Sequence, residues 1–386
     1  MNRASLVQRL IAGSLFLAAV LVAGCGVKEA TPTAAPKAAV TESAIPAWQQ
    51  RWDQVVTAAK KEGKLTVYGQ VSPAQRESLA VFQRKYGIDM EFAVGKGSEI
   101  ETKWTAEKNA GLNIADIFHV STGLGPTMKP KGAFAPISPN LILPETQDGK
   151  LWLRGEFPFL DADKTMVALS SAYESYTNVN TDMIKEGEIK SYRDFLKPEY
   201  KGKLVLFDPT IPSSSLGWVV FVMKDLYGLD GSKEYFRQLA ATAPMFTRDA
   251  GQELEWVARG KYAIGVGISH STASEYKARG APITMIRVSE GGSINCGSDA
   301  VELSSTAPHP NAAVVYLNWL FTEEGQIAFT KGSGTPPIRA GLNVEGIDPS
   351  RVPLPGEKVY IYGEGHSIFG PEAAKITREI FGDLLK

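Results

Sequence analysis

Apolar positions in the first part of the chain alternate between a helical period and short β-branched runs. In residues 48–62, Trp48, Trp52 and Val55 fall on one face of a helix that Gly63 ends. Residues 65–68 form an apolar run between two glycines, which predicts a buried strand. The same pattern predicts helices at 74–86 and 99–110, and strands at 89–94 and 115–120. Such strand–helix alternation is typical of a parallel sheet with helices on both faces.

The alternation resumes after a loop-rich middle section. Apolar, β-prone runs predict strands within the ranges 165–176, 203–208, 263–268 and 283–288. Helical spacing predicts helices at 215–226, 232–241, 253–259, 312–320, 324–330 and 371–385. The number of these units indicates an α/β protein with two lobes rather than one large sheet.

The N-terminus has the pattern of an export signal. Arg3 and Arg9 accompany an apolar run over 10–23, which is shorter than the roughly 20 residues that a spanning helix needs. The run leads into Leu21-Val-Ala-Gly-Cys25, which resembles the lipobox of bacterial lipoproteins. This resemblance implies a signal peptide at 1–24 and a mature chain that begins at a lipidated, palmitate-bearing Cys25. The alternative is an ordinary secretory signal with a chance cysteine. Residues 25–47, rich in Ala, Pro and Thr, predict a flexible linker.

Composition excludes several classes of protein. The net charge is -1, so no basic field attracts nucleic acid. Apolar residues make up 44% of the chain, which suffices for a core built without disulfides. The two cysteines are Cys25 and Cys296, and a lipidated Cys25 cannot pair with a second thiol. We therefore expect Cys296 to be free and buried.

Motifs for catalysis, cofactors and metals are missing from the sequence. There is no phosphate-binding loop, no H-E-x-x-H, no C-x-x-C and no EF-hand loop. The four histidines are His119, His270, His309 and His366, and they have no metal-ligand spacing. The sequence thus predicts a protein that is not an enzyme and has neither a resident cofactor nor a resident metal.

Several predicted strands end in small polar residues. These residues are Gln70, Ser72, Gly97, Ser98, Ser121, Thr122, Ser213, Ser214 and Ser215. Ligands of open parallel sheets bind at the carboxyl ends of strands, where helix N-termini and hydroxyls offer donors. Each Ser or Thr could instead only cap its own helix. His270 is either a satisfied polar residue near a strand end or a further donor to a ligand.

At this point the chain resembles the bacterial ABC-transporter solute-binding proteins with the type II periplasmic-binding fold, nearest the ferric-iron-binding group. The resemblance covers about 65–341 and depends on the order and spacing of short motifs. They include Ala115-Asp-Ile-Phe-His-Val-Ser121, Tyr176-Thr-Asn-Val-Asn180, Phe207-Asp-Pro-Thr210 and Ala307-Pro-His-Pro-Asn-Ala-Ala313.

The resemblance implies two lobes, with mixed sheets flanked by helices, that close on a ligand like a hinge. Lobe 1 would comprise 48–172 and 301–386, and lobe 2 would comprise 173–300. The polar strand ends named above would be ligand contacts. Further implications are a monomer outside the cytoplasm, anchored to the membrane through Cys25, whose partners are a small-molecule ligand and the transmembrane subunits of an ABC permease.

One departure from the family changes the expected ligand. Ferric binders of this group place two adjacent tyrosines where this chain has Ser269, His270 and Ser271. Hydroxyls, loop amides and a cation such as Lys96 or Arg339 suit a small oxyanion, for example a carboxylate or a phosphonate. Ferric iron is the alternative ligand. A transferase that uses Cys296 as its nucleophile, on the same scaffold, is a third possibility.

Overall fold

The first sheet is mixed, and most of its strands come from the N-terminal half of the chain. The computed structural model describes residues 45–294 and 299–385. Strand β1 (Lys64–Gly69) pairs in parallel with β2 (Asp89–Val94) and β3 (Ile117–His119). Strand β13 (Ala300–Ser304) runs antiparallel to β3, β4 (Phe134–Ala135) and β5 (Met166–Ala168). The chain therefore returns to this sheet after a long excursion.

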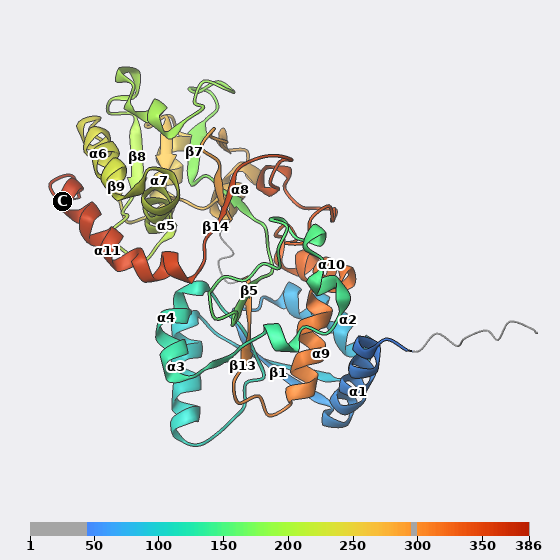
Figure 1. The fold of residues 1–386 in the computed structure, drawn as a ribbon. Coiled ribbons are helices and arrows are strands. Elements are labelled where there is room, and N and C mark those ends of the chain that lie inside the picture. The colour runs from blue at the N-terminus through green and yellow to red at the C-terminus, as the bar shows by residue number, and fades with distance from the viewer. Residues whose placement is uncertain (1–44, 295–298, 386) are drawn as a thin grey trace, which may run out of the picture. The chain divides into compact units, whose positions relative to one another are not determined.

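Helices cover both faces of the first sheet. They are α1 (Ala47–Glu62), α2 (Pro73–Tyr86), α3 (Gly97–Asn109), α9 (Pro310–Leu320) and α10 (Glu323–Ser333). Figure 1 shows α3 and α9 on opposite sides of β1 and β13. Helices α1 and α2 end at Gly63 and Gly87, whose φ angles of 69° and 66° are left-handed, a conformation that glycine adopts without steric cost.

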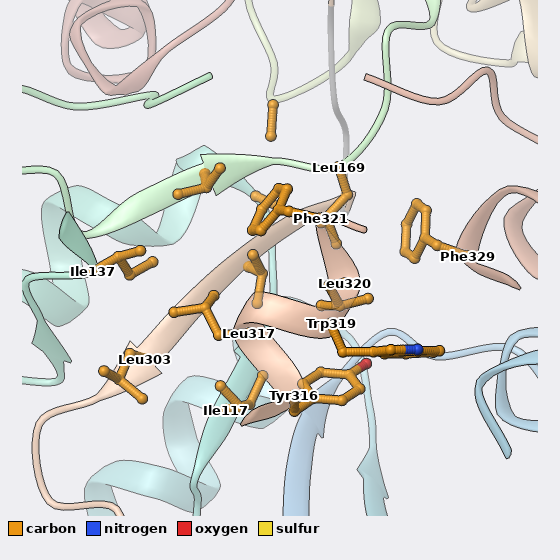
Figure 2. Packing of buried hydrophobic residues seen from close by; sticks show 14 of the residues in the cluster. Ile117, Ile137, Leu169, Leu303, Tyr316, Leu317, Trp319, Leu320, Phe321 and Phe329 are labelled. Carbon is orange, nitrogen blue, oxygen red and sulfur yellow. The ribbon is translucent and has the colours of Figure 1, made fainter. Parts of the chain in front are cut away.

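The first core forms because α9 is apolar nearly all round. Val315, Leu317, Trp319 and Leu320 of this helix are fully buried. Figure 2 shows α9 side chains beside Ile117 of β3 and Leu303 of β13. A helix that is apolar on all sides has to be enclosed by other elements, and here α1, α10 and the sheet enclose it.

A second sheet has its own helices and its own core. Its strand order is β11 (Ile283–Met285), β7 (Thr177–Asn180), β10 (Ile264–Val266), β8 (Leu204–Phe207) and β9 (Met245–Thr247). Strands β10, β8 and β9 are parallel, whereas β7 runs antiparallel to its two neighbours. Its helices are α5 (Ser214–Phe221), continued by one π-helical turn at Val222–Leu226, α6 (Gly228–Ala241), α7 (Ala250–Ala258) and α8 (His270–Ala278).

A small third sheet lies on the segments that run between the two larger sheets. It consists of β14 (Val359–Ile361), β12 (Gly292–Ile294) and β6 (Tyr173–Glu174). The closing helix α11 (Glu364–Phe381) begins next to the first sheet's short helices η1 (Thr122–Leu124) and α4 (Gly125–Met128). It then packs on α5 and α6 of the second sheet. The lobe boundaries drawn at 172/173 and 300/301 remain a prediction.

Short helical turns connect the remaining parts of the chain. They are η2 (Lys129–Lys131), η3 (Ser138–Asn140), η4 (Pro144–Gln147), η5 (Gly149–Leu151), η6 (Tyr192–Leu196), η7 (Pro198–Tyr200) and η9 (Pro349–Arg351).

Most predicted elements are present, and three differences from the prediction have physical reasons. The range 89–94 is a strand as predicted, and the helix expected at 48–62 is α1. Helix α11 begins at Glu364 rather than 371, so that Pro371 lies inside the helix instead of starting it. Helix α8 escaped prediction because its sequence, His-Ser-Thr-Ala-Ser-Glu-Tyr-Lys-Ala, has no apolar period. The first sheet is not wholly parallel, because β13 enters it antiparallel.

Some expectations concern residues outside the described ranges. These are the signal peptide at 1–24, the lipidated Cys25, nearly all of the 25–47 linker, and Cys296. In the described part of the chain, no helix combines the length and the apolar character needed to span a bilayer.

Candidate functional site

A cavity of about 940 Å³ opens where strand ends of the first and second sheets meet. Hydroxyl-bearing residues are the most numerous in its lining, beside a few charged side chains and apolar residues such as Leu216 and Pro371. The polar and aromatic residues that line it are Ser121, Thr122, Glu174, Tyr176, Thr210, Ser213, Ser214, Ser269, Ser271, Asp299, Ser333, Thr335, Arg351, Tyr362 and Ser367.

The second sheet contributes the N-terminus of α5 to the cavity. Ser213 caps this helix, since its hydroxyl accepts a hydrogen bond from the Leu216 amide at 3.2 Å. Ser214 donates to the Gly267 carbonyl at 2.5 Å. Ser215 is fully buried, donates to the Phe207 carbonyl at 2.7 Å and does not line the cavity. Two of the three predicted serines therefore lie at the cavity wall.

The first sheet contributes Ser121 and Thr122, which follow β3. The Thr122 hydroxyl accepts a hydrogen bond from Ser367 of α11 at 3.2 Å, so that α11 meets the first sheet's loop at the cavity.

Four other predicted contacts lie elsewhere. Ser72 and Gln75 form a capping box at the start of α2, and Gly97 and Ser98 begin α3. Gln70 is exposed, and its backbone N–H donates a hydrogen bond to the His119 carbonyl. None of these residues lines the cavity. The Ser72 hydroxyl caps its own helix, which was the alternative to a ligand contact.

Three charged residues that line the cavity were not predicted from the sequence. Glu174 and Asp299 are 4% and 9% exposed, and Arg351 is partly buried. Burial raises the pKa of Glu174 to about 7 and that of Asp299 to about 6, although the positive charge of Arg351 lowers both. Arg351, not the predicted Lys96 or Arg339, is the cation among the described lining residues. Arg339 instead contacts Glu145 at 2.5 Å.

His270 lies behind the cavity wall rather than in it. Its backbone N–H donates to Glu174 at 2.9 Å, and its Nε2 lies 2.8 Å from Oδ2 of Asp348. Burial lowers the pKa of His270, although Asp348 opposes this shift. His270 therefore orients Glu174 and Asp348 instead of facing a ligand.

The aromatic residues at the cavity do not form the tyrosine pair of ferric binders. Tyr176 and Tyr362 line the cavity from separate segments. Tyr176 has a φ of 55°, in a region that non-glycine residues rarely adopt. Burial raises the pKa of Tyr362 to about 12.

A carboxylate cluster outside the cavity has the geometry of a cation site. Ligand oxygens of Asp161, Asp163 and Glu364 lie within 4.8 Å of one another. Nζ of Lys129 lies 2.8 Å from a carboxylate oxygen of each, so that an ammonium group already neutralises this cluster.

Comparison with known proteins shows the family to which this chain belongs. Residues 77–346 match the family model described as bacterial extracellular solute-binding protein, and the chain belongs to this family. No curated protein sequence matches the chain.

Solved structures of related fold agree with this class. A ferric iron-binding protein A from Mannheimia haemolytica, in an open conformation, has a TM-score of 0.68 at 16% identity, covering 83% of this chain and 99% of its own. The Trichodesmium protein IdiA (FutA), in complex with iron and citrate, has a TM-score of 0.65 at 18% identity, covering 82% and 99%. The periplasmic binding protein AfuA of Actinobacillus pleuropneumoniae, with fructose-6-phosphate bound, has a TM-score of 0.55 at 23% identity, covering 84% and 99%. The expected two-lobed type II periplasmic-binding fold is confirmed.

Proposed function

We propose that this protein is the substrate-binding component of an ABC importer, and that it captures a small solute carrying an oxyanion, such as a carboxylate or a phosphonate. The observation that carries the ligand class is Arg351, the cation among the described residues that line the cavity, where hydroxyls and the N-terminus of α5 offer further donors. Charge-assisted hydrogen bonds contribute roughly 1.5–3 kcal/mol each. A few of them, less the cost of ordering the ligand, suffice for a micromolar affinity of about -8 kcal/mol.

Capture would proceed by closure of two lobes about the segments that carry the third sheet. The cavity wall draws on both larger sheets, so a ligand that contacts both walls stabilises the closed form. The closed form would then deliver the solute to the transmembrane subunits of a permease. The division into 48–172 with 301–386 and 173–300 belongs to this proposal, as does a monomeric state.

The test of the ligand class is thermal melting with a panel of small anions, amines, sugars and ferric salts. A bound solute at 100 times its dissociation constant stabilises the folded state by about 2.7 kcal/mol. We expect Arg351→Gln to abolish the shift given by an anionic solute. Arg279→Gln, which changes an exposed arginine at the end of α8, should retain the shift. Equal shifts in both variants would contradict the role of Arg351.

Ferric iron is the second candidate, because the cavity also offers oxygen atoms of the kind that a hard cation prefers. These come from Glu174, Asp299, Tyr176 and Tyr362. Of the similar solved structures described above, one is a ferric iron-binding protein and another contains iron and citrate. Native mass spectrometry of freshly purified protein separates the candidates, since a ferric adduct that survives in Arg351→Gln would replace the oxyanion as ligand and leave the transport role intact.

A lipid anchor at Cys25 completes the proposal and rests on the lipobox-like segment alone. It would tether an extracytoplasmic protein to the cell membrane after removal of residues 1–24. Labelling of growing cells with palmitate should mark the protein, and Cys25→Ser should lose the label and leave the membrane fraction. A membrane-bound, labelled Cys25→Ser variant would contradict the anchor.

A further inference from the structure

The three charges in the cavity influence one another without forming ion pairs. The positive charge of Arg351 acts on both Glu174 and Asp299. Yet within the described residues no carboxylate oxygen lies within 4.0 Å of the Arg351 guanidinium nitrogens. One cation and two carboxylates thus line the same cavity without forming an ion pair with one another.

Each of the three side chains is held by hydrogen bonds to groups other than its possible ionic partners. Glu174 accepts from the His270 amide at 2.9 Å, and Asp299 is hydrogen-bonded by the hydroxyls of Thr335 and Ser170. Nη1 of Arg351 donates to the Gly334 carbonyl at 3.3 Å, while its Nε is buried and has no hydrogen-bond partner among the described residues. A buried guanidinium N–H without a partner and buried carboxylates without a cation are both unfavourable. The cavity therefore has both a positively charged group and negatively charged groups without an ionic partner in the part of the chain that the structure describes.

The charge balance discriminates between classes of solute. A simple oxyanion satisfies Arg351 but brings a further negative charge toward Glu174 and Asp299. An uncharged polyol is served by the serine and threonine hydroxyls and needs none of the three charges. A solute that carries an ammonium group next to its oxyanion complements all three.

We propose that the solute is a zwitterion, with its oxyanion against Arg351 and its ammonium group against Glu174 and Asp299, as in an amino acid or an aminoalkyl phosphonate. This inference rests on the proposed capture of an oxyanion and narrows it to one chemical class.

The experiment compares matched solutes by isothermal titration calorimetry at pH 8, above the raised pKa values of Glu174 and Asp299, so that both carboxyls are ionised. The arms are a panel of α-amino acids, their N-acetyl derivatives, the corresponding deaminated acids, and aminoalkyl phosphonates beside plain alkyl phosphonates. We expect at least one amino-bearing solute to bind about tenfold or more tightly than both its N-acetyl and its deaminated counterparts, since tenfold corresponds to one charge-assisted contact. The carboxylate and phosphonate arms distinguish the two sources of the oxyanion.

Variants assign the two ends of the solute. Glu174→Gln and Asp299→Asn should each weaken the amino-bearing solute about tenfold and leave its deaminated analogue unchanged or improved. Arg351→Gln should weaken both. Glu253→Gln is the matched control, because Glu253 is also a buried carboxyl but belongs to α7 and lies outside the cavity wall. Melting of the ligand-free variants checks that each is folded.

The outcomes separate this inference from the proposed function. Deaminated or N-acetylated acids that bind as tightly as their amino-bearing partners would overturn the zwitterion and leave oxyanion capture standing. Failure of every amino-bearing solute to bind, with plain anions binding well, would overturn it likewise. If no small solute of the panel bound at all, oxyanion capture and the zwitterion would both be wrong.

Discussion

Nε2 of His270 lies 2.8 Å from Oδ2 of Asp348 and thereby joins the first residue of α8 to the residue that caps η9. Asp348 also accepts hydrogen bonds from the amide and the hydroxyl of Ser350, at 2.9 and 2.7 Å. The turn that Asp348 caps ends at Arg351. This contact therefore places the cationic residue of the cavity relative to the second sheet.

The first prediction concerns Asp348 and pH. Although burial opposes it, hydrogen bonds from Ser350 and His270 lower the pKa of Asp348 from 3.8 to about 2. A lowered pKa means that the stabilisation is complete above about pH 4 and is lost as the pH falls toward 2. Asp348→Asn should cost about 1 kcal/mol at pH 7, a modest value because a third of the side chain is solvent-exposed. In urea unfolding, the gap to wild type should narrow below pH 4, and a gap that is constant down to pH 2.5 would contradict the assignment.

The second prediction concerns Glu253 of α7, whose two carboxyl oxygens have no hydrogen-bond partner in the described part of the chain. Burial raises its pKa well above 4.5, so the folded state keeps a proton that the unfolded state has lost. Stability should therefore fall as the pH rises above about 4.5, by at most about 1.4 kcal/mol per pH unit from this group. Glu253→Gln should reduce this slope and be more stable than wild type at pH 8.

The neighbouring Glu255 supplies the control for that experiment. It lies on the same helix, is exposed, and pairs with Arg259 at 2.5 Å. Glu255→Gln should leave the pH dependence of unfolding unchanged. A wild-type slope in Glu253→Gln would show that this carboxyl is ionised in the folded protein.

The third prediction concerns Lys129 and its three carboxylates. Burial opposes the charge of Lys129, but Asp161, Asp163 and Glu364 together raise its pKa. Lys129→Met leaves three unneutralised carboxylates and should destabilise the protein by about 1.5–3 kcal/mol. Oxygen clusters of this kind bind calcium, so millimolar calcium should restore part of the loss in the variant and not in wild type.

Lys131 provides a contrast on the same turn. Its ion pair with Glu101 at 2.7 Å is more exposed than the Lys129 cluster, so Lys131→Met should cost less than 1 kcal/mol and show no calcium response. Equal losses for the two lysines would indicate that the Lys129 cluster has no special role.

The fourth prediction concerns Gly267, which follows β10 and lies two residues before Ser269 of the cavity wall. Its φ is 104°, and a Cβ there would lie 2.4 Å from the Ser215 hydroxyl. Its carbonyl also accepts from Ser214. Gly267→Ala should lower the free energy of unfolding by about 2 kcal/mol or more and weaken solute binding.

Gly280 is the control position that separates the effect of backbone strain from that of a steric clash. It has a φ of 88° with no atom near the position of a Cβ. Gly280→Ala should cost about 1 kcal/mol, since it carries the backbone strain alone, and should leave solute binding unchanged. An equal cost in both variants would mean that the Ser215 contact is relieved by a small shift.

Sequence patterns located elements well where the apolar period was strong. The ranges of α1, α2 and β2 follow from apolar spacing and from the glycines that end the helices. Helix α8 has no such period, and its position depends on contacts such as that of His270 with Asp348. The start of α11 was displaced because a proline that usually begins a helix lies inside this one.

For the polar residues at strand ends, the sequence could not predict which ones line the cavity. Ser72 and Ser213 both cap helices through the same hydroxyl chemistry, yet only Ser213 lies at the cavity. Nothing in either local sequence distinguishes them. The difference is that the α5 end of the second sheet faces the first sheet's loops, a relation between distant segments.

By itself, the sequence determined the succession of most strands and helices, the family, and the expectation of a hydroxyl-rich binding protein, because apolar period and short motifs are local properties of a chain. Only the tertiary structure decided that Glu174, Asp299 and Arg351 share one space. These residues come from three distant segments, and the electrostatic energy of charges depends on their separation and burial, which folding alone sets.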